Sequence, residues 1–289
     1  MKLSELFNVP PNEQDFYDLD LCGDTKLFIE PGRILVSKDE LSRQAWTDIK
    51  DFFACLVAAH GEGASDLERF MIVEHLHEVN ATKLGYGNGR NGKAKTPKGM
   101  LQTFSQLGDF LKQDVPISEP FDFPLLFPKF GIDCLSDAIT NILLNRLSEY
   151  TYEQCERLHV DENYFRVPKK ELYYWNAEMH RWEVYQRKQL IINGEVILLV
   201  PKRWLDSYLY CNTNHFLNKM ILHTLQDEQT TIVDGKLMRP TIKILSQYVR
   251  EKHGLPHDVV VEFVRKNPDL LRRYHNMIYS YYRNRYPNQ

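Results

Sequence analysis

Apolar residues recur every three to four positions along several stretches of the chain, which is the period of an amphipathic helix. Residues 37–60 show it most clearly, and Ser37 and Glu40 have the spacing of a capping box at the start. Ser65 and Glu68 repeat that spacing before a second helix. The pattern predicts helices at 37–60, 65–78, 96–110, 133–150, 151–159, 209–225, 241–252, 259–265 and 268–286.

The period changes to two after residue 163, where the segments FRVP, ELYYW, WEVY, QLII and EVILLVP indicate strands. Asn193-Gly194 is a strong hairpin turn, and 27–36 is expected to be a short apolar strand with a turn at Pro31-Gly32. The sequence therefore predicts an α+β protein with helical N- and C-terminal regions around a small antiparallel sheet.

A Pro/Phe-rich connector after residue 115 suggests two parts. We expect a helical N-terminal region, 1–115, that carries a Gly/Lys-rich loop at about 83–99. We expect an α+β region, 116–289, with central hairpins and C-terminal helices.

Composition excludes disordered, collagen-like and coiled-coil proteins. Of the 289 residues, 43% are hydrophobic and 26% are charged, which is normal for a globular chain. No run approaches the roughly 18 apolar residues of a membrane span, and the N-terminus has no signal-peptide core, so we expect a cytoplasmic protein without a membrane partner. The five cysteines are scattered, as reduced thiols are.

The net charge of −3 hides an uneven distribution. Residues 1–70 carry 7 basic and 14 acidic side chains, whereas residues 239–289 carry 10 basic and 4 acidic ones. The Gly/Lys-rich loop contains five basic residues and no acid between 83 and 98. Basic segments of this kind can contact DNA or RNA phosphates.

Two basic segments are therefore candidate nucleic-acid contacts. Their residues are Arg90, Lys93, Lys95 and Lys98 in the loop, and Arg272, Arg273, Arg283 and Arg285 near the C-terminus. The C-terminal arginines alternate with tyrosines, which can stack on bases. A solvated loop and an ordinary amphipathic helix remain the alternatives. The loop also matches GxxxxGK, but Ala94 stands where a P-loop needs a hydroxyl group.

Asp133 and Asp137 are one helical turn apart and could hold Mg²⁺ or Mn²⁺ for phosphodiester chemistry. Favourable charge at a helix N-terminus explains the same acids without a metal. Two Cys-x-x-x-His pairs, Cys155/His159 and Cys211/His215, could together form a zinc site. Chance explains that spacing equally simply among 5 Cys and 10 His, so the sequence does not favour zinc.

Four stretches resemble a group of bacterial proteins associated with mobile elements and anti-phage defence islands. They are LFIEPGRI at 27–34, EVNATKLGYGNGRNGKA at 78–94, GIDCLSDAITNILLNRLSEYTYEQC at 131–155 and ILLVPKRWL at 197–205. The resemblance implies a biological context and no established reaction. The residues it marks for testing are Glu78, Gly85, Asp133, Ser136, Asp137, Asn141, Thr151 and Lys202.

Two hypotheses follow from these observations. The first is a component of a bacterial anti-phage defence system that engages nucleic acid and could act as a Mg²⁺-dependent nuclease, with Asp133 and Asp137 assisted by Glu78. The second is a non-catalytic subunit that docks on an ATPase or nuclease partner within a defence complex, through its acidic N-terminal region and tyrosine-rich C-terminus.

Overall fold

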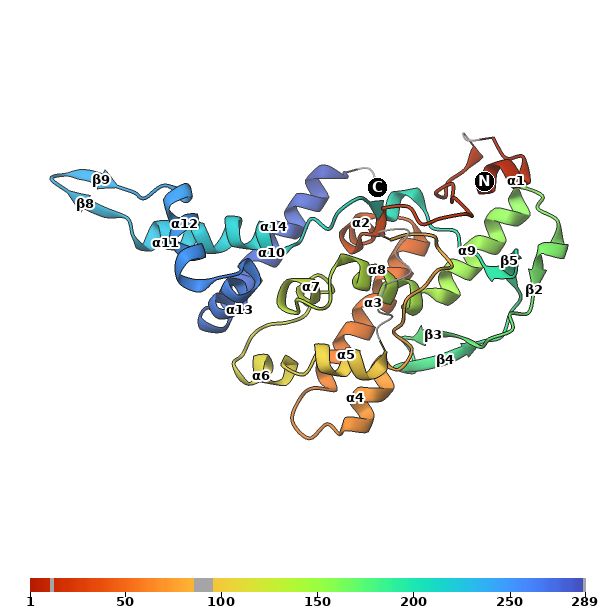
Figure 1. Cartoon of the computed structure of the whole chain (residues 1–289), viewed down its shortest axis with the longest axis horizontal. Coiled ribbons are helices and arrows are strands. Elements are labelled where there is room, and N and C mark those ends of the chain that lie inside the picture. Colours follow the sequence, from red (N-terminus) through yellow and green to blue (C-terminus); the bar gives the residue numbers. More distant parts are fainter. Residues whose placement is uncertain (11–12, 86–95, 288–289) are drawn as a thin grey trace.

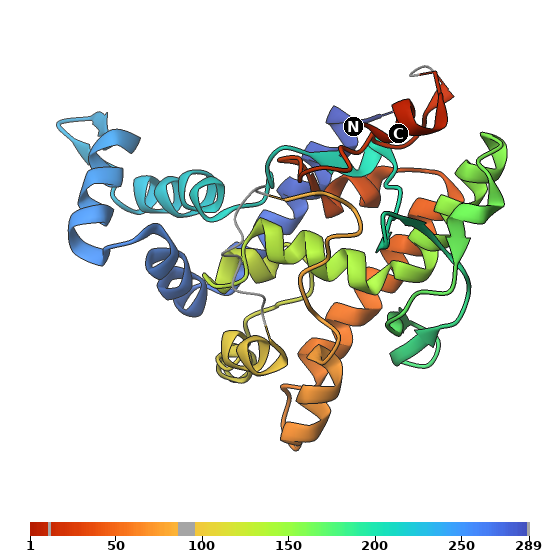
Figure 2. The ribbon, with the colours of Figure 1, turned by 45° about the vertical axis from the view of Figure 1, so that its right-hand side comes forward.

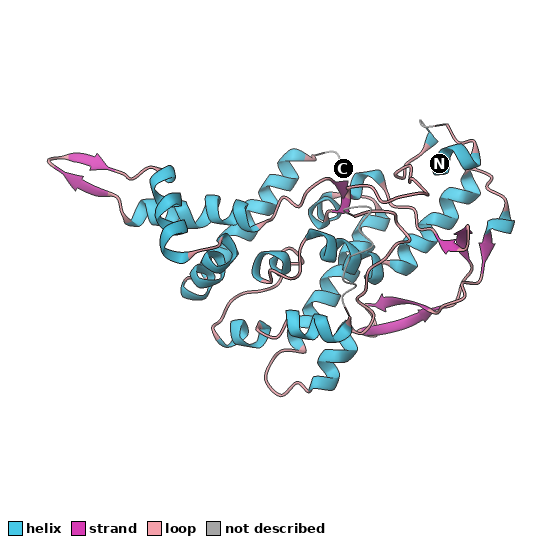
Figure 3. Ribbon diagram, viewed as in Figure 1, coloured by secondary structure: helices cyan, strands magenta, loops and turns pink. Residues whose placement is uncertain are grey.

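The computed structural model describes residues 1–10, 13–85 and 96–287. It shows an α+β protein in which helices flank small antiparallel sheets (Figures 1 and 3). This confirms the fold class expected from the sequence. Among the described residues, no helix combines the length and apolar character needed to cross a membrane.

The N-terminal half is built from short helices around one long helix. Its elements are α1 (Leu3–Phe7), β1 (Phe28–Ile29), α2 (Pro31–Val36), α3 (Glu40–Ala58), α4 (Asp66–Val73), α5 (Pro97–Thr103), α6 (Leu107–Lys112), α7 (Asp122–Leu126), α8 (Ile132–Ile142) and α9 (Leu144–Arg157). The long helix, α3, packs against α2, α4 and α8 (Figure 1).

Sheets and a C-terminal helical region follow. The first group is the 3₁₀ turn Glu162–Tyr164, β2 (Phe165–Arg166), β3 (Leu172–Asn176), β4 (Arg181–Tyr185), β5 (Gln189–Ile192), β6 (Glu195–Val196), the 3₁₀ turn Lys202–Trp204 and β7 (Leu205–Asp206). The second group is α10 (Thr213–Phe216), a π-helical turn (Leu217–Ile221), α11 (Leu222–Glu228), β8 (Thr231–Val233), β9 (Lys236–Met238), α12 (Ile242–His253), α13 (Pro256–Lys266) and α14 (Asp269–Arg285).

Every strand pairing among the described residues is antiparallel. The β2–β5–β6 sheet and the β3–β4 hairpin lie on one side of the helices. Asn193 and Gly194 both have positive φ, 52° and 84°, which confirms the hairpin turn between β5 and β6. β1 pairs with β7 and so joins segments almost 180 residues apart.

Two helix starts with side-chain caps lie where the sequence places them. Ser65 caps α4 in a capping box with Glu68, and Thr96 caps α5 with Pro97 at the first helical position. Two expected helices are each divided. The helix expected at 96–110 breaks between α5 and α6, and the one at 133–150 breaks at Leu143, after which α9 runs on to Arg157.

The expected strand at 27–36 is mostly wrong. Only Phe28–Ile29 is extended, and Pro31 begins helix α2. Proline suits the first helical position, and the Glu30 side chain accepts a hydrogen bond from the Gly32 N–H there. Consequently Ser37 ends α2 and does not cap α3, whose cap is Asp39. The expectation of helices alone after residue 204 also missed the β8–β9 hairpin.

One hydrophobic core runs through the helices on both sides of the boundary expected near residue 115. Phe53 of α3 packs on Phe123 of α7 with ring centroids 4.6 Å apart. A second core joins the N-terminal segment to α9 and the β2–β5–β6 sheet. From the first core, the C-terminal helices extend outward and carry β8–β9 at their far end (Figures 1 and 2).

Candidate functional site

The candidate acidic site is centred on Asp137, on the second turn of α8. Its carboxyl group is half-buried, and its Oδ1 accepts a 3.4 Å hydrogen bond from the Val79 N–H. Burial raises the pKa of this carboxyl group to about 8, and the negative charge of Asp133 adds to the increase. Glu78 and Asp24 contribute further negative charge. The neighbouring negative charges thus oppose ionisation of Asp137.

Two hydrogen bonds hold the neighbouring chain segments against α8. The Asn141 side-chain amide donates to the His77 carbonyl oxygen at 2.8 Å and so positions the segment that contains Glu78. The Ile29 N–H donates to the Ser136 hydroxyl group at 3.0 Å. Thus Ser136 and Asn141, which the resemblance marked, connect α8 to the segments around it.

Gly85 brings the backbone close to the acids. Its φ is +137°, which disfavours other residues, and a Cβ atom there would lie 3.1 Å from Asp133 Oδ1. The Gly85 N–H donates to the Thr25 carbonyl oxygen at 3.0 Å, beside Asp24. The Gly/Lys-rich loop therefore starts at the acidic cluster.

The charges of Asp133 and Glu78 thus act on the half-buried Asp137 carboxyl group, as does that of Asp24, which the sequence analysis missed. Asp24 is 113 residues from Asp137 and carries no local spacing signal. Within the described ranges, no three of these acids place oxygens within 4.8 Å of one another. The cluster is therefore open and is not a closed cage of protein ligands.

The structure describes one of the four predicted basic contacts in the Gly/Lys-rich loop. Arg90, Lys93 and Lys95 lie outside the described residues, and Lys98 is exposed on α5. Lys83, by contrast, is buried and forms a 2.5 Å ion pair with Glu195, so its ammonium group supports the fold.

The four predicted C-terminal arginines, Arg272, Arg273, Arg283 and Arg285, are all exposed on α14. Two of the tyrosines among them, Tyr274 and Tyr282, are buried in the core and cannot stack on bases. This region is therefore an amphipathic helix that packs its tyrosines inward and leaves its guanidinium groups in solvent.

The structure separates the residues of the zinc site that the sequence allowed but did not favour, Cys155, His159, Cys211 and His215. Cys155 lies in the second core, whereas Cys211 lies in the first. The His215 Nδ1 atom is 3.0 Å from the Tyr274 hydroxyl oxygen. His159 lies beyond the end of α9 and Cys211 lies before α10, so neither pair occupies one face of a helix. The two segments pack into separate apolar cores, and equal spacing does not bring them together.

Two further residues marked by the resemblance have structural contacts. The Thr151 hydroxyl group accepts a 2.8 Å hydrogen bond from the Leu199 N–H. The Lys202 ammonium group donates to the Gln14 carbonyl oxygen at 2.8 Å. Both contacts join distant segments of the chain and lie outside the acidic cluster.

Two cavities lie near other polar side chains. The larger, about 1000 Å³, is lined by α4, α5 and α6 and includes His60, Arg69 and Asp109. It contains none of the residues proposed from the sequence. The smaller, about 450 Å³, is lined by Trp175 and Trp182 and by Cys55 and His180, two members of a cluster of polar residues on α3 and the β3–β4 turn.

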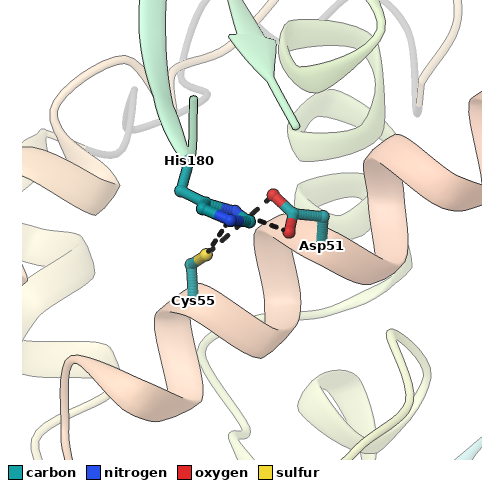
Figure 4. A group of neighbouring side chains, drawn as sticks. All are labelled: Asp51, Cys55 and His180. Carbon is teal, nitrogen blue, oxygen red and sulfur yellow. Dashed lines mark hydrogen bonds and ion pairs between the residues drawn. The ribbon is translucent and has the colours of Figure 1, made fainter. Parts of the chain in front are cut away.

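That cluster is Asp51, Cys55 and His180, which the sequence analysis missed (Figure 4). His180 Nδ1 lies 2.8 Å from Asp51 Oδ1 and 3.7 Å from Cys55 Sγ. Burial and the charge of Asp51 raise the pKa of the Cys55 thiol to about 11, which disfavours the thiolate. One imidazole nitrogen faces both partners, whereas a nucleophilic triad uses two. This is the one such group of metal-ligating side chains in the described residues.

The sequence of residues 8–212 matches the family described as a domain of unknown function, DUF8370. The chain belongs to this family. The matched segment contains the acidic cluster and the Asp51/Cys55/His180 cluster, and it ends just before α10. No curated protein and no solved structure matches the chain.

Proposed function

We propose that this protein is a Mg²⁺-dependent nuclease whose metal site includes Asp133 and Asp137, with assistance from Glu78. The observation that carries the proposal is the half-buried Asp137 carboxyl group, surrounded by three other acids. A divalent cation at this point would stabilise the ionised form of Asp137, which burial and the neighbouring acids disfavour.

The openness of the cluster agrees with magnesium. Mg²⁺ usually binds through one or two carboxylates and keeps several waters, and substrate phosphate oxygens complete its shell. In a nuclease the ion would activate one of those waters and stabilise charge on the scissile phosphate. Lys98 and the α14 arginines are exposed cations that could bind the rest of the strand.

The resemblance to proteins of defence islands supplies the context of the proposal. The nuclease would act on DNA or RNA in the bacterial cytoplasm as a component of an anti-phage defence system. Mn²⁺ would support the same chemistry, since it also prefers oxygen ligands.

The test is cleavage of labelled single- and double-stranded DNA and RNA with Mg²⁺, with Mn²⁺ and with chelator. Asp137→Asn keeps the shape of the side chain and removes its charge. We expect it to lower the cleavage rate at least ~100-fold and to leave nucleic-acid binding within about threefold, because metal activation is lost. The matched control is Glu153→Gln, at an exposed position of α9.

Absence of cleavage on every substrate, or full activity in Asp137→Asn, would refute the nuclease. Loss of activity in Glu153→Gln as well would show contamination or general damage, and the assay would then not support a site at Asp137.

A second candidate function, a subunit that docks on an ATPase or nuclease partner, is favoured by the β8–β9 hairpin. All six of its strand residues are exposed, including Ile232 at 74% and Leu237 at 66%. The hairpin projects from the end of the molecule (Figures 1 and 2). An exposed apolar surface on an isolated hairpin is typical of a protein-binding element.

This candidate predicts that Ile232→Ser with Leu237→Ser weakens binding of the partner at least ~10-fold, because apolar contact area is lost. The measurement is the affinity for a partner that co-purifies with the chain. Leu67→Ser, at a 66% exposed position of α4, is the control. An unchanged affinity in the hairpin variant would exclude this surface.

A further inference from the structure

We propose that Asp51, Cys55 and His180 form a zinc-binding site, separate from the acidic cluster and independent of the proposed nuclease. Carboxylate oxygen, thiolate sulfur and imidazole nitrogen are the three donor types found in protein zinc sites. Magnesium and calcium, in contrast, select oxygen donors alone. The mixed set of donors therefore points to a transition metal.

Local geometry places two of the ligands. Asp51 and Cys55 are four residues apart on α3, so their side chains project from the same face of the helix. Cys55 Sγ lies 3.9 Å from Asp51 Oδ2. A continuous 19-residue helix holds this pair, which makes the spacing of the two donors rigid.

The third ligand comes from the turn between β3 and β4. His180 has a φ of +52°, a conformation in which histidine is enriched among non-glycine residues. Two backbone N–H groups of the turn, those of Glu178 and Met179, donate to the Asn176 side-chain oxygen at 3.0 and 3.1 Å. This turn directs the imidazole ring toward α3 (Figure 4).

Packing fixes the hairpin on α3. Trp175 is buried, pairs with Trp182 across the hairpin, and contacts the Phe52 ring edge-to-face at 5.1 Å. The position of His180 relative to Asp51 and Cys55 is thus determined by a packed core and not by the three side chains themselves.

One of the donor separations matches that expected around a shared ion. Tetrahedral zinc with bonds of about 2.0–2.3 Å places its donors roughly 3.3–3.7 Å apart. The nitrogen-to-sulfur distance of 3.7 Å is in this range, and all three donors lie within 4.8 Å of one another. The 2.8 Å contact between His180 and Asp51 is a hydrogen bond that a zinc ion would replace.

A tryptophan orients the carboxylate ligand. Trp175 Nε1–H donates to Asp51 Oδ2 at 2.7 Å and leaves Oδ1 directed at His180. Hydrogen bonds to ligand carboxylates are typical around zinc and fix their orientation. Three protein ligands leave a fourth position open, and the adjoining 450 Å³ cavity, lined also by Met71 and Trp182, has room for a water or a small substrate there.

The test is zinc binding by the full chain after treatment with chelator, measured by equilibrium dialysis and elemental analysis. We expect one zinc per chain, and Co²⁺ in its place should give a thiolate-to-cobalt charge-transfer band. Cys55→Ser removes the sulfur, and His180→Asn removes the imidazole with a residue that tolerates positive φ. Each should weaken zinc binding at least ~100-fold, and Cys55→Ser should abolish the cobalt band.

The matched controls are Cys22→Ser and His223→Asn, both at exposed positions, and Asp137→Asn in the acidic cluster. Each should leave zinc affinity within about threefold of the unaltered chain, so failure of the nuclease proposal would not affect this result. Thermal melting without metal checks that the variants fold. Less than ~0.1 zinc per chain, or stoichiometric zinc retained by both Cys55→Ser and His180→Asn, would overturn the proposal.

Discussion

Burial raises the pKa values of the Glu30 and Asp137 carboxyl groups, but the groups around the two side chains differ. Glu30 is 1% exposed, and burial raises the pKa of its carboxyl group to about 7. It accepts hydrogen bonds from the Tyr282 hydroxyl group at 2.7 Å and from the Gly32 N–H at 3.1 Å. Glu30 therefore links α2 to α14. Asp137 instead lies among other carboxylates, so its charged form gains from a cation.

The protein should lose stability as the pH rises toward 8, and Asp137 is one cause. Its pKa is raised from 3.8 to about 8 in the folded state, so its contribution is fully present below pH 4 and lost as the pH passes 8. Asp137→Asn should therefore raise Tm at pH 8.5 by at least about 3 °C relative to the unaltered chain, with little gain at pH 4.

Thermal melts at the two pH values, with Glu153→Gln as control, measure this effect. Adding Mg²⁺ at pH 8.5 should stabilise the unaltered chain and not Asp137→Asn, because only the former has the charged site. Equal melting temperatures for the two chains at pH 8.5 without metal would contradict the assigned pKa.

At the scale of elements, the contact of α2 with α14 depends on Gly32. A Cβ atom at this position would lie 2.1 Å from the Tyr282 ring, which is itself buried and hydrogen-bonded to Glu30. Neither the ring nor the helix backbone can yield easily, since both are enclosed by the core. This close approach holds the C-terminal helix on the N-terminal half.

Gly32→Ala should consequently destabilise the protein by about 2 kcal/mol or more, through overpacking between α2 and α14. Chemical denaturation measures the free energy of unfolding. Gly99→Ala on α5 is the control, because its Cβ would meet Thr96 Oγ1 at an ordinary 3.4 Å. That variant should change stability by less than ~1 kcal/mol. A neutral Gly32→Ala would show that α14 can move away from α2.

In the molecule as a whole, the two candidate metal clusters and the projecting hairpin belong to different segments of the chain. Both clusters lie within residues 8–212, the segment that matches the family, whereas β8–β9 and α12–α14 follow it. Basic residues are also concentrated toward the C-terminus. The family segment would thus supply the chemistry, and the C-terminal region would supply contacts to a partner or to nucleic acid.

Lys93, Lys95 and Lys98 should contribute to nucleic-acid binding through phosphate contacts. Replacing all three with Glu should make the negative slope of log K against log salt concentration shallower by about 1 to 3. Each phosphate contact that is lost means that about one fewer counterion is released on binding. The control is the same change at three other exposed lysines, Lys169, Lys170 and Lys188. They are distant along the chain from the residues of the acidic cluster. An unchanged slope would exclude the loop as a phosphate contact.

Helix starts and tight turns could be predicted from the sequence, because they depend on neighbouring residues. The capping box at Ser65, the Thr96-Pro97 helix start and the Asn193-Gly194 turn each use contacts within a few residues, so local spacing was sufficient. Asp234-Gly235 carries the same kind of turn signal, and the β8–β9 hairpin could have been found from it.

Which distant side chains meet depends on how the helices and strands pack against one another. His180 meets Cys55 across 125 residues because the β3–β4 hairpin packs on α3. Asp24 comes near Asp137 because its segment is hydrogen-bonded to α8, through the Ile29 N–H and the Ser136 hydroxyl group. The same packing separated Cys155 from Cys211 despite their matching motifs. Periodicity shows that a face is apolar, but it does not state which other face will cover it.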